Sequence, residues 1–112
     1  MNSQNEEDAF RLPAARKIGQ LDDRAVQRLL AEVNWSDLIL LIWYMCSPEL
    51  GALLTKNMSR GAAEGLLEEL QSKHGHTHPD SATNEMLQSA RAATLRIVST
   101  LGRLQDSGEI EI

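Results

Sequence analysis

Three histidines alternate with other residues in one short segment, at His74, His76 and His78, and Asp80 follows. Imidazole nitrogens and carboxylate oxygens bind zinc, copper and nickel, and alternate residues of an extended loop can converge on one ion. A structural zinc site usually draws its ligands from two separate elements, and the sequence holds no second Cys or His pair. We therefore predict a polar loop and no cofactor, with these histidines as a metal candidate of low specificity.

Cysteine and paired carboxylates also perform catalysis, but neither pattern predicts an enzyme here. Cys46 ends the apolar run that starts at Leu38. Burial raises the pKa of a thiol and makes it inert, so we expect a buried structural cysteine. Glu68 and Glu69 are adjacent, and adjacent helical positions point about 100° apart, which prevents them from sharing a proton as a catalytic dyad does. No phosphate-binding loop, dinucleotide fingerprint or metalloprotease helix occurs. The predicted protein is not an enzyme.

The spacing of apolar residues predicts an all-α fold, a single small bundle of five to six helices. Capping residues precede several of the expected helices. The expected helical segments are about 22–33, 35–46, 48–56, 60–73 and 81–104. The last residues, 109–112, alternate as in a short strand or an extended tail.

The first residues are expected to differ from the rest. Residues 1–12 are polar, and Pro13 marks a boundary because the residue before a proline avoids helical geometry. One or two helical turns can follow before Gly19. We therefore divide the chain into a flexible N-terminal lead, 1–20, and a helical domain, 21–112.

Length and charge exclude several classes of function. The chain has 112 residues and a net charge of −5, which argues against binding nucleic acid. Its one cysteine cannot form an internal disulfide, and the acidic start lacks the features of a signal peptide. The longest apolar run is far shorter than the about 20 residues that span a bilayer. A cytoplasmic protein is the prediction.

Two sets of side chains are candidates for binding a protein partner. Glu64, Glu68 and Glu69, with Arg60 at the helix start, form what we call the acidic ridge. Most such ridges are simply solvated faces. Trp43 and Tyr44 are favoured as core residues, but a helix that is apolar all round is hard to bury fully in a small chain. If exposed, these two rings would mark a protein contact.

Three stretches carry recognisable patterns: Leu21-Asp-Asp-Arg-Ala-Val-Gln-Arg-Leu-Leu-Ala-Glu-Val33, Lys56-Asn-Met-Ser-Arg-Gly-Ala-Ala63 and Leu104-Gln-Asp-Ser-Gly-Glu-Ile110. Taken in order, they resemble the C-terminal domain of the flagellar motor switch protein FliG. The family patterns are an L-D-D-R-x-I/V-Q-x-L/V-L helix opening, an N-M-S-x-R-A-A junction and a closing L-x-x-x-G-E-I. The likeness covers roughly residues 21 to 112.

The resemblance implies a six-helix cytoplasmic domain at the rim of the rotor, with one charged helix facing the cytoplasmic loop of the stator. The acidic pair of that helix falls on Glu68 and Glu69. A family arginine falls on Gly61, with Arg60 one position earlier, and a family lysine falls near Trp43. The proline and arginine of a family G-P-V-R segment are replaced by the histidine loop.

The family's N-terminal and middle domains have no counterpart, and its aromatic hinge is not matched by Leu12 to Ala15. We interpret the chain as a free-standing, divergent copy of the torque domain. The predicted function is non-enzymatic protein binding in the flagellar motor, in motility and chemotaxis, with stator or switch proteins as partners and no small-molecule substrate. Such partners would bring it near the inner membrane, at the cytoplasmic face of the basal body.

Two alternatives remain open from the sequence. A helical adaptor outside the flagellum would bind its partner through an exposed surface at Trp43 and Tyr44. A metal-binding regulator would use His74, His76 and His78.

Overall fold

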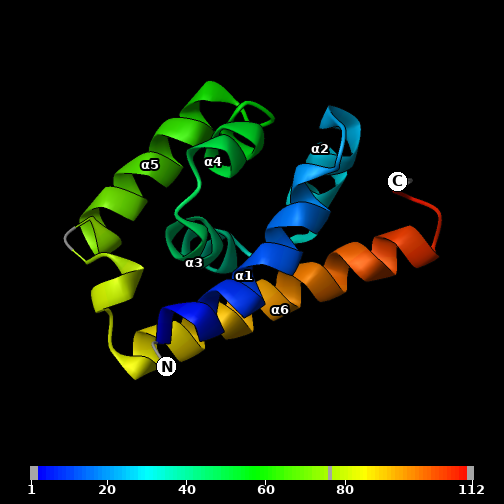
Figure 1. The fold of residues 1–112 in the computed structure, drawn as a ribbon. Coiled ribbons are helices and arrows are strands. Elements are labelled where there is room, and N and C mark those ends of the chain that lie inside the picture. The colour runs from blue at the N-terminus through cyan, green and yellow to red at the C-terminus, as the bar shows by residue number, and fades with distance from the viewer. Residues whose placement is uncertain (1–2, 76, 111–112) are drawn as a thin grey trace.

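Helices account for the whole regular structure of the described residues, 3–75 and 77–110 of this computed structural model (Figure 1). A short 3-10 turn, η1, covers Pro79–Ser81. The helices are α1 Ser3–Gly19, α2 Asp23–Glu32, α3 Trp35–Met45, α4 Pro48–Thr55, α5 Arg60–His74 and α6 Asn84–Asp106. The predicted all-α fold is confirmed. Among these described segments, no helix is long and apolar enough to cross a membrane.

Side-chain caps start the helices where the sequence predicts them. The Asp22 carboxylate accepts from the backbone N–H of Ala25 at 2.8 Å, and the Ser59 hydroxyl accepts from Ala62 at 3.1 Å. Asn34 and Ser47 cap α3 and α4 in the same way. Such a cap supplies a partner to a backbone N–H that the helix cannot satisfy itself.

The longest helix starts later than predicted. The hydroxyl of Thr83 accepts from the backbone N–H of Met86 and caps α6, whereas Asp80 and Ser81 belong to the separate turn η1. The ring of Pro79 fixes the start of that turn. The structure therefore has two helix starts, those of η1 and α6, where the sequence predicted one.

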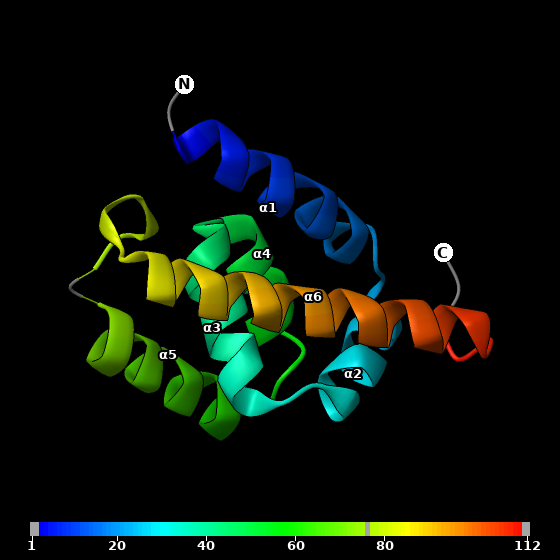
Figure 2. The same ribbon diagram turned by 90° about the horizontal axis from the view of Figure 1, so that it is seen from below.

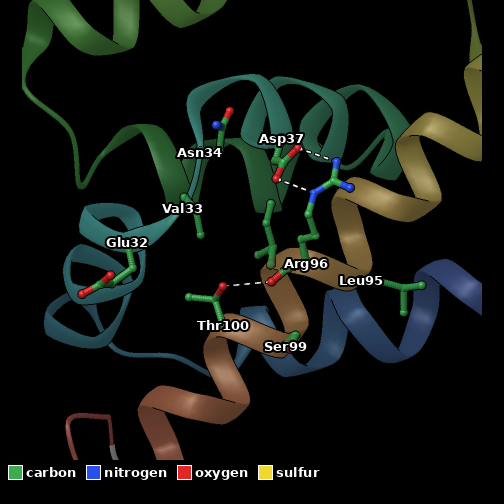
Figure 3. Close-up of a pocket in the computed structure, with 9 residues that line it drawn as sticks. Glu32, Val33, Asn34, Asp37, Leu95, Arg96, Ser99 and Thr100 are labelled. Carbon is green, nitrogen blue, oxygen red and sulfur yellow. Dashed lines mark hydrogen bonds and ion pairs between the residues drawn. The ribbon is translucent and has the colours of Figure 1, made fainter.

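The core forms where α3 packs along α6. Leu41 and Tyr44 of α3 are fully buried, as are Leu101 and Leu104 of α6. An ion pair reinforces this contact at the surface: the Arg96 guanidinium donates two hydrogen bonds to the Asp37 carboxylate, at 2.9 and 2.8 Å (Figure 3). The central helix is thus covered on most sides, as its unbroken apolar sequence requires.

Burial of the aromatic residues decides one open alternative. Trp43 is only 6% exposed, and its indole N–H donates to the carbonyl oxygen of Thr77 at 2.7 Å. Tyr44 is fully buried. The core interpretation of both rings is confirmed, and the premise of an exposed aromatic surface at Trp43 and Tyr44 is wrong.

The first seventeen described residues, predicted as an irregular lead with one or two helical turns, instead form the single helix α1. Pro13 lies inside it. A proline removes one backbone hydrogen bond, but the carbonyl group that loses it, that of Ala9, belongs to an exposed residue and can bind water. Ala14 and Ile18 are buried where α1 packs on its neighbours. The division of the chain at residue 20 stays a prediction.

The described end of the chain forms a cap on α6 and packs against the core. Gly108 adopts a φ of +79°, and the backbone N–H groups of Glu109 and Ile110 both donate to the Leu104 carbonyl oxygen. This positive φ is the conformation that favours glycine after a helix. Ile110 is buried, and Arg28 of α2 binds the Glu109 carboxylate. A turn therefore replaces the predicted strand or tail at 109–110, and residues 111–112 lie outside the described residues.

Candidate partner-binding site

Helix α5 lies at one edge of the molecule (Figures 1 and 2), and all but one of its residues are at least partly exposed. The structure describes every residue of α5, and only Leu66 among them is buried. Its packing is mainly against α3. A helix attached by so few buried side chains leaves a broad face free for a partner.

The acidic ridge lies on this exposed face. The Arg60 guanidinium binds the Glu64 carboxylate at 3.1 Å, and the Lys73 ammonium lies 3.5 Å from the Glu69 carboxylate. Both pairs are exposed, and exposed pairs of this kind contribute little stability. Glu68 is exposed between them and has no ion pair among the described residues. The centre of the ridge therefore carries a free negative charge.

The histidines of the loop have different surroundings. The His74 ring lies 5.2 Å from the Trp43 ring, measured between centroids, and partial burial lowers the pKa of His74. His78 is exposed, and its Nδ1 accepts from the backbone N–H of Asp80 at 3.1 Å. His76 lies outside the described residues. In the part of the chain that the structure describes, no three His, Cys, Asp or Glu side chains are grouped to hold a metal.

Cys46 was predicted to be buried, and this prediction is wrong. The residue follows the last turn of α3 with a φ of +49°, a left-handed conformation that ends the helix and leaves Cys46 exposed. Its sulfur lies 3.7 Å from Nε2 of His78. Partial desolvation still raises the pKa of the Cys46 thiol, which does not favour a reactive thiolate.

A buried polar cluster that the sequence analysis missed attaches α1 to the core. The Glu7 carboxylate accepts from the Tyr44 hydroxyl at 2.5 Å and pairs with the Arg91 guanidinium of α6. The guanidinium of Arg11 lies over the Tyr44 ring, 4.8 Å from its centroid. Hydrogen bonding to Arg91 lowers the pKa of Glu7, and burial raises the pKa of Tyr44 to about 12. These groups hold the fold together and lie away from the acidic ridge.

Comparison with known proteins identifies the family. Residues 12–112 match the family described as the FliG C-terminal domain. The chain belongs to this family. It is also 36% identical over 95 residues to the flagellar motor switch protein FliG of Thermotoga maritima. That match covers 85% of this chain and 25% of the relative, so the chain spans about a quarter of that protein's length.

The FliG C-terminal resemblance placed two basic residues at positions that lack them here, and the structure describes both. Gly61 is exposed, and a Cβ atom added there would meet no atom within 4 Å beyond its chain neighbours and the backbone of its own helix. The positive charge is therefore missing because of the residue type and not because of crowding. Trp43 is buried against the loop that follows α5. Arg60, the neighbour of Gly61, has a side chain that is 94% exposed and points its charge at Glu64.

Proposed function

We propose that this chain binds a protein partner of the bacterial flagellar motor through the acidic ridge of α5, and that it does so without catalysis. The observation that carries the proposal is the combination of family membership with a helix that exposes Glu64 and Glu68 while burying only Leu66. The partner is the cytoplasmic loop of the stator or another switch protein. The site of action is then the cytoplasmic face of the basal body.

Exposed charges of this kind act mainly on encounter and register. Complementary charge raises the association rate and selects the orientation of a partner, whereas each exposed ion pair adds little affinity. The ridge holds three glutamates against one arginine, Arg60, which is bound to Glu64, and Gly61 contributes no charge, so the surface is net negative. A partner segment with basic side chains therefore fits it best.

Reversing two ridge charges tests the proposal. The double variant Glu68→Lys, Glu69→Lys should keep its helical circular dichroism, because Glu68 is exposed and Glu69 is half-exposed. Binding to the purified cytoplasmic loop of the stator should weaken by at least about tenfold, since attraction becomes repulsion. Swimming of cells that carry the variant in the chromosome should fall as well.

The matched control makes the same change in charge elsewhere. Glu85→Lys with Asp106→Lys alters two exposed acidic residues at the ends of α6. This variant should bind the loop and support swimming like the parent protein. The proposal fails if the ridge variant binds and swims normally, or if both variants lose binding to the same extent.

A further inference from the structure

An apolar hollow lies beside the acidic ridge, between α4, α5 and the end of α3. Its volume is about 530 Å³, and it is open to solvent. Ile42 of α3, Pro48 and Ala52 of α4, and Leu67 of α5 form apolar parts of the wall. Cys46 and His78 also line it. The hollow is therefore an indentation beside α5, the helix that carries the ridge.

Leu67 is the unusual residue of this wall. It is 53% exposed, although its neighbour Leu66 is fully buried. Adjacent helical positions point about 100° apart, so Leu66 fills the core while Leu67 faces the hollow. Glu64 precedes Leu67 by one helical turn, and Glu68 follows it directly. A single exposed leucine is common, but an apolar depression rimmed by polar side chains is typical of binding surfaces.

We propose that this hollow receives an apolar side chain from a basic helical segment whose cationic side chains meet Glu64 and Glu68. The inference rests on the proposed function and specifies the chemistry of its partner. Charge complementarity selects this occupant. A second copy of the chain is a poorer fit, because it would bring its own acidic ridge toward this one. The apolar anchor supplies affinity, and the ridge supplies orientation.

Cys46 provides a direct report on occupancy. It is the only cysteine of the chain, and it lines the hollow. We would measure its rate of alkylation by iodoacetamide at about pH 8.5, since the thiolate is the reacting form. The probe is a synthetic basic helical peptide with one leucine stripe. Saturating peptide should slow the alkylation of Cys46 at least fivefold.

Two changed peptides test the two parts of the recognition. One replaces the leucines by serine, and the other replaces the lysines by glutamate. Neither should slow the reaction of Cys46. Equal protection by the acidic peptide, or no protection by the basic leucine peptide, would overturn the inference. If Cys46 is protected without any peptide and sedimentation shows dimers, a second copy of the chain is the occupant. This result would also overturn the inference.

A matched pair of protein variants separates the hollow from general surface effects. Leu67→Ser should weaken binding of the basic leucine peptide by about tenfold or more, because an apolar contact is lost. Leu95→Ser is the control. Leu95 is 57% exposed on α6 and lines a different depression, together with the paired Asp37 and Arg96 (Figure 3). Equal weakening by both variants, or no effect of Leu67→Ser, would contradict the assignment.

The inference and the proposed function can fail separately. The stator loop could bind the parent protein and fail to bind after reversal of Glu68 and Glu69, yet leave the alkylation rate of Cys46 unchanged. In that case the ridge alone binds and the hollow is not used. If the basic leucine peptide protects Cys46 but no motor protein binds, the surface chemistry is correct and the motor partner is wrong.

Discussion

Replacing Glu7 with alanine should lower the free energy of unfolding by about 3 kcal/mol, in the range for breaking a buried ion pair. The Tyr44 hydroxyl, fully buried, would lose its acceptor, and Arg91 would lose its carboxylate partner. The expected loss lies at the lower end of the range because the Arg91 side chain is about one third exposed and can bind water. Chemical denaturation followed by circular dichroism measures the effect.

The pH dependence of the free energy of unfolding separates the contribution of the Glu7 charge from that of its side-chain packing. Arg91 lowers the pKa of Glu7 in the folded protein, so the unfolded state binds more protons between the folded and unfolded pKa values. The stabilisation is therefore complete above the unfolded pKa, about 4.3 for glutamate, and is lost as the pH falls through the folded pKa.

Glu7→Gln provides the control for this effect. Its amide oxygen can still accept from Tyr44, but the side chain does not titrate. The stability of the parent protein should fall more steeply with acid than that of the glutamine variant. Parallel curves for the two proteins between about pH 5 and pH 3 would show that the Glu7 charge does not anchor α1.

Leu66→Ala is the second change with a large expected effect, about 3 kcal/mol of lost stability. Leu66 is fully buried, and it is the one buried residue of α5, whose positions are all described. Truncation leaves a cavity beneath this helix. Amide hydrogen exchange should therefore speed up in α5 more than in α6.

The neighbouring leucine is the control for this prediction. Leu67→Ala should change stability by no more than about 0.5 kcal/mol, since Leu67 is more than half exposed. Similar losses from both truncations would mean that α5 is not held mainly by Leu66. Uniform acceleration of exchange over all six helices would mean that α5 unfolds only with the whole domain.

The sequence predicted the helices well wherever a capping residue precedes a regular apolar stripe. Asp22 before α2 and Ser59 before α5 are examples, because capping acts within one turn of the chain. Helix α1 was missed because its inward side includes Glu7, and an apolar pattern cannot show a carboxylate that is buried with a distant arginine. Arg91 lies 84 positions further along, and no local rule connects such a pair.

The candidate site also has one part that the local sequence predicts and another that depends on tertiary packing. The exposure of Glu64 and Glu68 follows from their helical spacing, which the sequence shows directly. The hollow beside Leu67 depends on how α5 crosses α4 and α3, so it has no local signal. Cys46 was misplaced because an apolar run does not reveal its last residue turning outward into a left-handed cap.

The attachment of α5 also has a mechanical consequence. A sideways load on this helix would pass into α3, the element against which α5 mainly packs, and into the backbone at the two helix ends. From α3 it spreads along α6, a rod of 23 residues that also touches α1 and α2. We therefore expect α5 to yield to such a load before α6 does, because α5 has one buried side chain and α6 has seven.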